Sequence, residues 1–435
     1  MKSLGFAHRN YFVEDDEPVL NAEVYRAIRF ARQFTRLCPN LRNMNWDNIN
    51  VWLDDIYLLL GPQIRRLQLA FNPIDFAAQS LIRSIPIICP HLTWFTVFVH
   101  GVHDDHEIRE TIWEVFSCCQ LTVVRCNLSI SQRALQHLAS MAALQEISLD
   151  LSGINNIASL SLTQCAFPAL RSLELTGKMA TALLDALSSC KLESIKIQFA
   201  RTVNDAPLMT RFFQVLHARC SHRSLTAFDV AFDRSPVARH LDINVDMLRP
   251  LLSFVNLRKM VIRSCHRFKL DNDFVGAMAK AWPHLRILQL GSYGSWGGQS
   301  NVTLAGLVPL VQHCPDLSRL GLVIDATVVD HSLDIPVSNT KLKALREGKS
   351  PDKHAATDAG SSIKESPKLN SISGWSLTIH WFSMEDRVKY RGRWDEVVRL
   401  TKIFADVRQM ERQKKDGCSD QSEQSHIDIQ ALTRS

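Results

Sequence analysis

One pattern recurs along this chain: a leucine-like residue followed, three and five positions later, by two more apolar residues. The clearest copies begin at Leu144, Leu170, Leu192 and Leu285. Looser copies begin at Leu41, Ile64, Leu92, Leu121, Leu225, Leu257, Leu317 and Leu369. Most neighbouring copies start 22 to 33 residues apart. Self-similarity at such a period indicates a repeat architecture, and it limits the possible folds more than any other feature of the chain.

Each copy predicts a short β-strand, because its last two apolar residues point to one face while the residues between them point to the other. A single unit cannot close a core, so neighbouring units must stack. We therefore expect an α/β solenoid, a horseshoe with a concave parallel β-sheet and helices on the convex side. Residues 271–282 predict one such helix, with Asp271 or Asn272 as its cap and Pro283 after its end. Its apolar face would contain Phe274, Val275, Met278 and Ala279.

The composition divides the chain into further segments. Residues 335–368 are rich in Lys, Ser, Asp, Gly and Ala, so burial cannot offset the entropy of ordering them, and we predict a disordered insert loop. Residues 369–411 are expected to form a final repeat strand and a C-terminal capping helix, a lid being favoured over a partner-binding helix. We predict a disordered tail at 412–435. An N-terminal cap segment at 1–36 would precede the repeat array at 37–334.

The cysteines lie at characteristic places in the repeats. Of eleven cysteines, Cys38, Cys89 and Cys314 each begin a Cys-Pro-x-Leu turn directly before a predicted strand. The chain contains no Cys-x-x-Cys motif, so we interpret these residues as small buried apolar side chains rather than as metal ligands or disulfides. With these turns, residues 257–285 resemble the cysteine-containing leucine-rich repeat of F-box proteins. The resemblance covers about residues 37–334, and the chain as a whole resembles fungal F-box-like proteins.

The resemblance implies an intracellular protein-protein interaction module, the substrate-recognition part of an SCF-type ubiquitin ligase receptor. Members of the family carry an N-terminal F-box that docks on a Skp-type adaptor of a cullin ligase. Residues 1–36 contain no Leu-Pro-x-Glu opening of an F-box. Two explanations stay open: an F-box lies upstream of this chain, or the chain is an F-box-less leucine-rich repeat scaffold or regulatory binding protein. The adaptor and cullin are expected partners only in the first case.

The sequence predicts no enzyme, cofactor or metal site. The histidines of His-Gly-Val-His-Asp-Asp-His, at 100–106, have no second ligand cluster nearby. The glycine-rich stretch at 291–300 lacks the Gly-Lys-Ser/Thr ending of a phosphate loop. A GTPase-activating role, a distant third hypothesis, would require a positioned catalytic arginine that the sequence does not identify.

The chain has neither a signal-peptide-like start nor a run of 18 apolar residues, which predicts a soluble protein of the cytoplasm and/or nucleus without membrane contact. The formal net charge is +6. Because the excess of basic residues lies at 387–415 and the array is balanced, nucleic-acid binding is unsupported.

The strand residues between the inward-pointing pairs predict a concave partner-binding surface. Two aromatic residues stand on a face that is usually polar, followed by a mostly acidic middle zone and a basic far zone. Aromatic anchors supply affinity and charges supply selectivity, so a protein substrate or ligand is expected there. The candidate residues are Trp94, Phe98, Arg125, Glu146, Asp150, Glu174, Lys196, Asp229, Lys259, Arg263 and Arg319.

Overall fold

The computed structural model divides the chain into two compact units, one built from Met1–Val203 with Thr210–Leu225 and one from Asn204–Met209 with Thr226–Ser435. It describes residues 3–7, 37–47, 53–71, 76–100, 106–157, 166–187, 191–199, 206–232, 242–264, 267–291, 300–325, 344–346 and 371–372. We call these two compact units the first unit and the second unit, in the order given above.

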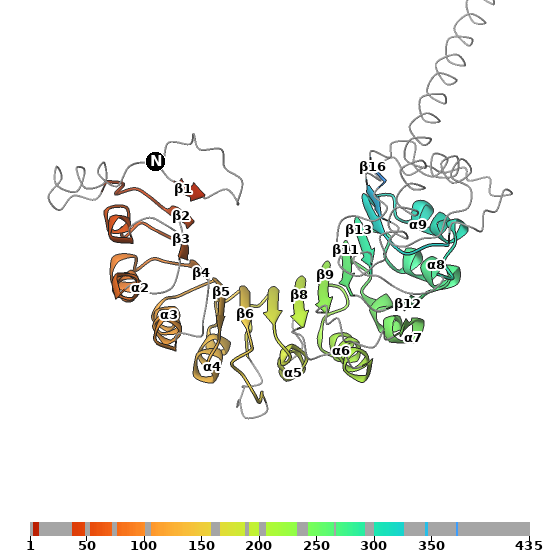
Figure 1. The fold of residues 1–435 in the computed structure, drawn as a ribbon, viewed down its shortest axis with the longest axis horizontal. Helices are drawn as coiled ribbons and strands as arrows, with labels where there is room; N and C mark the ends of the chain where they lie inside the picture. The colour runs from red at the N-terminus through yellow and green to blue at the C-terminus, as the bar shows by residue number, and fades with distance from the viewer. Residues whose placement is uncertain are drawn as a thin grey trace, which may run out of the picture. The chain divides into compact units, whose positions relative to one another are not determined.

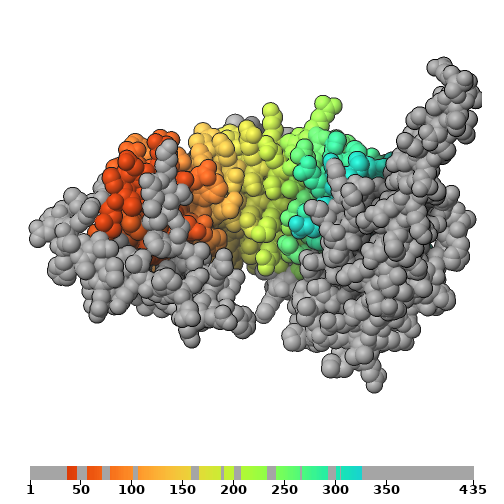
Figure 2. Space-filling view, turned by 90° about the horizontal axis from the view of Figure 1, so that it is seen from above, coloured from red at the N-terminus to blue at the C-terminus, as the bar shows by residue number. Residues whose placement is uncertain are grey.

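The first unit contains a parallel sheet whose strands follow one another in chain order (Figure 1). Its strands are β1 (Ser3–Ala7), β2 (Asn43–Asp47), β3 (Arg66–Phe71), β4 (Trp94–Val99), β5 (Val123–Ser129), β6 (Glu146–Asp150), β7 (Ser172–Thr176) and β8 (Ser194–Phe199). Successive stretches of sequence therefore form neighbouring bands in the space-filling view (Figure 2).

The helices of the first unit cover one face of this sheet (Figure 1). They are the 3-10 helix η1 (Leu53–Leu58), α2 (Phe76–Ile88), α3 (His106–Cys118), α4 (Gln132–Ser140) and α5 (Ala180–Ala186). Helix α6 (Ala206–Arg219) is divided between the two units. Phe95 of β4 packs edge to face on Phe116 of α3, with ring centroids 5.1 Å apart. The apolar strand residues thus face the helices. We call the other side of the sheet the open face.

The second unit repeats this arrangement. Its parallel sheet contains β9 (Ala227–Phe232), β11 (Lys259–Arg263), β13 (Ile287–Leu290), β14 (Arg319–Gly321), β15 (Ala344–Arg346) and β16 (Ser371–Ile372). A separate pair joins β10 (Asp242–Asn244) to β12 (Arg267–Lys269). The helices are α7 (Val245–Leu248), η2 (Arg249–Ser253), α8 (Asn272–Ala281), η3 (Leu304–Leu307) and α9 (Val308–His313).

A tight turn precedes most of the described repeat strands. The N–H of Leu92 donates to the carbonyl of Cys89 over 3.1 Å, and Leu317 bonds Cys314 in the same way. Proline after the cysteine suits the second position of such a turn. The carbonyl of the residue after the turn then accepts two N–H groups of the next repeat, as Arg65 does from Thr93 and Trp94, both over 2.9 Å. This shared carbonyl links neighbouring repeats within each unit.

The α/β solenoid architecture predicted from the repeat is confirmed. The first residues of the copies from Leu41 to Leu317 are all at most 3% exposed. Helix α8 also matches its prediction: the Asp271 side chain accepts the N–H of Phe274 over 2.8 Å as N-cap, and the predicted apolar face is buried.

The interpretation of the turn cysteines is confirmed for Cys89 and Cys314, both 0% exposed, whereas Cys38 is only half-buried. The Cys314 thiol lies 3.4 Å from the carbonyl oxygen of Trp282, in the preceding repeat. Burial raises the pKa of Cys314 to about 12, and that of Cys126 to about 12 as well. These thiols therefore behave as packing groups rather than as nucleophiles.

Two short strands lie in segments where the sequence predicts no repeat strand. Strand β15 lies inside the predicted disordered insert at 335–368, between β14 and β16, and β1 lies inside the predicted cap segment, beside β2. The repeat pattern is incomplete at β15, where Glu347 takes the last apolar position and the edge of β14 supplies the hydrogen-bond partners, whereas Met1, Leu4 and Phe6 fit the pattern at β1. The predicted disordered tail at 412–435 and the capping helix predicted within 369–411 lie outside the described residues.

Candidate protein-binding surface

The open face of the first unit is formed by strand residues that alternate with the buried ones. In β6 the buried residues are Ile147 and Leu149, so Glu146, Ser148 and Asp150 lie on the open face. The register places Trp94 directly between Arg66 of β3 and Val123 of β5, and Glu146 beside Val123. Side chains from neighbouring repeats therefore form continuous rows across the sheet.

Trp94 is the centre of a cluster that connects four neighbouring strands. The guanidinium carbon of Arg66 lies 4.6 Å from the centroid of the Trp94 ring, and that of Arg125 lies 5.4 Å from it. Arg125 Nη2 also donates to Glu146 Oε2 over 2.9 Å. We call Arg66, Trp94, Arg125 and Glu146 the tryptophan–arginine cluster. Both arginines are within the range of a cation–π interaction with the indole.

The indole of Trp94 is fixed along its own strand. Its Nε1 donates to Thr96 Oγ1 over 3.0 Å, and Thr96 is only 2% exposed although it stands on the open face. Trp94 itself remains partly exposed, as does Phe98 two positions beyond Thr96. The two aromatic residues predicted from the sequence are thus on the open face and in partial contact with solvent.

The remaining predicted residues of the first unit pair locally. Lys196 of β8 forms an ion pair with Glu174 of β7, which stands directly opposite it. Asp150 accepts the N–H of Ser152 over 2.8 Å and so closes the turn after β6. The acidic middle zone predicted from the sequence is therefore largely neutralised, because Glu146 and Glu174 each have a cationic neighbour.

Sequence reasoning missed the role of Asn127. Strand β5 bulges after Arg125, and the side chain of Asn127 binds the backbone of Val99 in β4 at both polar groups. Its Oδ1 accepts the Val99 N–H over 2.9 Å, and its Nδ2 donates to the Val99 carbonyl over 2.8 Å. An asparagine amide carries one acceptor and two donors, so it can replace a strand neighbour where the ladder is interrupted.

The second unit brings three predicted residues together. Asp229 of β9 lies between two cations of β11: Lys259 Nζ is 2.7 Å from its Oδ2, and Arg263 Nη2 is 2.6 Å from its Oδ1. The Lys259 contact is an aligned hydrogen bond, whereas the Arg263 contact is an ion pair without hydrogen-bond alignment. Only 7% of the Asp229 side chain is exposed, so the two cations compensate a buried carboxylate. Arg319, at the start of β14, is exposed.

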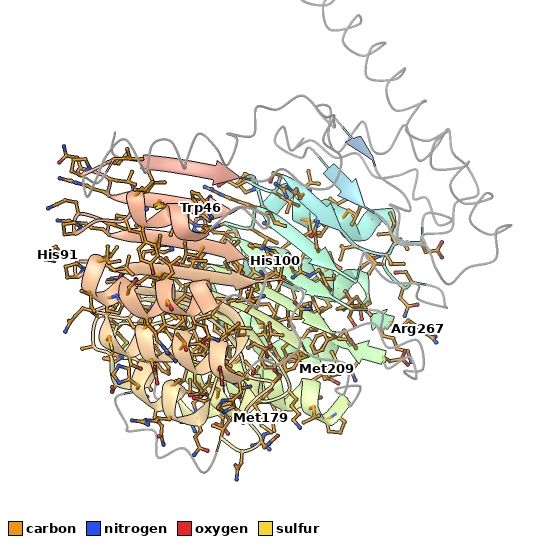
Figure 3. All side chains as sticks on the ribbon, turned by 60° about the vertical axis from the view of Figure 1, so that its left-hand side comes forward. Trp46, His91, His100, Met179, Met209 and Arg267 are labelled. Atoms are coloured by element: carbon orange, nitrogen blue, oxygen red, sulfur yellow. The ribbon has the colours of Figure 1, made fainter. Side chains whose placement is uncertain are left out.

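The residues considered for metal binding do not form a site within the described part of the chain. No group of three or more His, Cys, Asp or Glu side chains occurs there in a metal-binding arrangement. His100 lies at the end of β4, and His91 at the opposite end of the same strand (Figure 3). His103, Asp104 and Asp105 fall outside the described residues. Among the described helices, none has the length and apolar character needed to cross a membrane.

No family model and no curated protein matches the sequence. One solved structure that it is similar to is a structural-genomics crystal structure of a Bacteroides fragilis protein, 14% identical, covering 63% of this chain and 72% of that chain, with a TM-score of 0.29. The parallel sheet with helices on one face is that of a repeat solenoid. A repeat-like α/β fold of this kind suggests a protein-interaction module.

Proposed function

We propose that the open face of the first unit binds an extended segment of a partner protein. The observation that carries this proposal is the tryptophan–arginine cluster: a partly exposed indole lies between two guanidinium groups on a rigid sheet. Tryptophan and arginine are the side chains most enriched among residues that dominate binding energy, and the strands hold them in place before binding. Phe98, on the same face of β4, extends the apolar part of this surface.

We propose further that the chain is the substrate-recognition part of an F-box receptor of SCF type, acting in the cytoplasm and/or nucleus. The support is the resemblance of the repeats, with their Cys-Pro-x-Leu turns, to the cysteine-containing repeats of that family. In the three Cys-Pro-x-Leu turns the carbonyl of the cysteine accepts the N–H of the leucine three residues later. A Skp-type adaptor and a cullin are partners in this proposal if an F-box lies upstream of the chain.

The binding surface is tested by the double substitution Trp94→Ala with Phe98→Ala. We expect capture of the native partner to be abolished while the protein remains folded, because both residues contact solvent on the open face. A matched control is Tyr57→Ala with Ile87→Ala on the helical side of the same unit, where 83% of Ile87 is exposed. Equal loss of capture in both double variants, measured by affinity purification, would contradict the proposal.

The ligase role is tested by tagging the protein at its C-terminus at the native locus and identifying its peptides and partners by mass spectrometry. Peptides upstream of Met1 together with a Skp-type adaptor and a cullin would support the F-box receptor. An N-terminus at Met1 with neither partner would leave an F-box-less binding scaffold.

A further inference from the structure

Arg66 differs from the other cations on the open face of the first unit. Arg125 pairs with Glu146, and Lys196 pairs with Glu174. Arg66 is exposed, and within the described part of the chain it forms no ion pair. Its guanidinium carbon lies instead 4.6 Å from the centroid of the Trp94 ring.

The aromatic contact leaves this guanidinium available for an anion. The contact of a guanidinium with an aromatic ring is not a hydrogen bond, so it uses none of the five N–H donors that Arg66 carries. A carboxylate can accept two of these N–H groups at once, and such bidentate bonds are among the strongest that side chains form. Because the indole already restricts the arginine, little rotamer freedom remains to be lost on binding.

The charges of the cluster indicate which anion fits. Arg66 and Arg125 carry two positive charges, and Glu146 removes one of them by its ion pair with Arg125. The net charge of +1 matches one carboxylate. A phosphate group carries up to two negative charges and is best bound where several cations converge. The cluster therefore favours an Asp or Glu side chain over a phosphorylated one.

The neighbouring aromatic residue places a second requirement on the partner. Phe98 stands four residues along β4 from Trp94 on the same face, which corresponds to about 13 Å. An extended partner segment covers that distance in about four residues. An apolar side chain near Phe98 would then lie about four residues from the acidic one.

We propose that the partner segment is acidic, with one Asp or Glu side chain bound to Arg66 over Trp94 and an apolar side chain about four residues away. This inference rests on the proposed function, because it names the chemistry of the segment that the open face binds.

The test is selection of a random 12-residue peptide library, displayed on phage, on the purified full-length chain. We expect the selected peptides to be enriched in Asp or Glu. Dissociation constants of one labelled selected peptide are then measured by fluorescence anisotropy for Arg66→Glu and for Arg65→Glu. Arg65 is the matched control, since it is also exposed and undergoes the same charge change but lies outside the strand. Arg66→Glu is expected to weaken binding by about tenfold or more, and Arg65→Glu by less than about threefold.

Several results would overturn the inference. They are selected peptides that are neutral or basic, an equal effect of the two arginine substitutions, or binding that requires phosphoserine in place of the acidic residue. A selection that enriches no peptide on the folded chain would also refute it. The proposed function has its own readout, capture of the native partner by the Trp94 and Phe98 double variant. If the Trp94 and Phe98 double variant loses capture as expected but the selected peptides are not acidic, the proposed binding surface is correct. The proposed acidic chemistry of the partner is then wrong.

Discussion

The ion-paired group of Asp229, Lys259 and Arg263 gives a prediction about which of its three charges is buried. The Asp229 side chain is 7% exposed, whereas Lys259 and Arg263 are 39% and 36% exposed. Removing the carboxylate leaves two cations that can turn toward water on long side chains. Removing both cations leaves a buried carboxylate without compensation. The two perturbations break the same contacts, yet their costs differ because the groups left behind differ in solvation.

The expected magnitudes follow from these exposures. Lys259→Met with Arg263→Met is expected to destabilise the β9–β11 pair by about 3–5 kcal/mol, the usual cost of leaving one member of a buried ion pair alone. Asp229→Ala is expected to cost only about 1–2 kcal/mol, because the cations are more than a third exposed and their interactions are screened. The triple variant removes every charge, and we expect it to be more stable than the double cation variant.

Hydrogen exchange of β9 and β11, measured by mass spectrometry, reports the difference in local stability between these variants. A loss of about 3 kcal/mol corresponds to exchange faster by over about a hundredfold when opening is local. The exposed pair of Arg249 and Asp246, 67% and 82% exposed and 3.7 Å apart, supplies a control, since Arg249→Met is expected to change exchange little. An Asp229→Ala effect as large as that of the double cation variant would refute the argument that the carboxylate is the buried charge.

Two further predictions concern the repeats. Asn127→Ala removes both bonds to the Val99 backbone and is expected to lower the free energy of unfolding by about 1–3 kcal/mol in urea melts. Asn127→Asp keeps the acceptor but places a carboxylate oxygen against the Val99 carbonyl oxygen, so it is expected to cost at least as much. A neutral Asn127→Ala would show that water replaces the amide. Folding raises the pKa of the Cys126 thiol from its ordinary value of 9.0 to about 12, so the folded state holds a proton that the unfolded state loses, and the free energy of unfolding should decrease as the pH rises from about 9 toward 12. Cys126→Ala is expected to flatten this decrease, and an unchanged slope would mean that Cys126 does not cause it.

The periodic pattern of the sequence was sufficient to predict the strands of the repeat copies and their buried faces. Leu144 and Leu285, which precede their strands in the repeat, are both 0% exposed. The repeat period alone predicts that a leucine at this position is buried. The same alternation correctly placed Trp94 and Glu146 on the open face. These properties depend on local spacing and burial, which a single sequence contains.

The contacts between repeats could not be predicted in the same way. Whether Arg125 binds Glu146 depends on the relative register of β5 and β6, and that register changes at the bulge after Arg125. No apolar pattern marks this bulge, since the residue that stabilises it is a polar asparagine bound to the neighbouring backbone. Strand β15 was missed for a related reason: three residues have too little pattern of their own, and the edge of β14 determines their pairing.

The ion pairs change what the open face can recognise. From the sequence, an acidic middle zone would attract a basic partner. Glu174 pairs with Lys196 and Glu146 pairs with Arg125, so both carboxylates already have a cationic partner. Among the open-face residues of the first unit that the structure describes, Arg66 is the cation without a carboxylate partner. A partner that brings a positive charge to Glu146 or Glu174 would have to displace one of these pairs, whereas a partner that brings a carboxylate to Arg66 gains a contact without breaking either. The pairing within the sheet, more than the count of charged residues, therefore decides which sign of charge the surface selects.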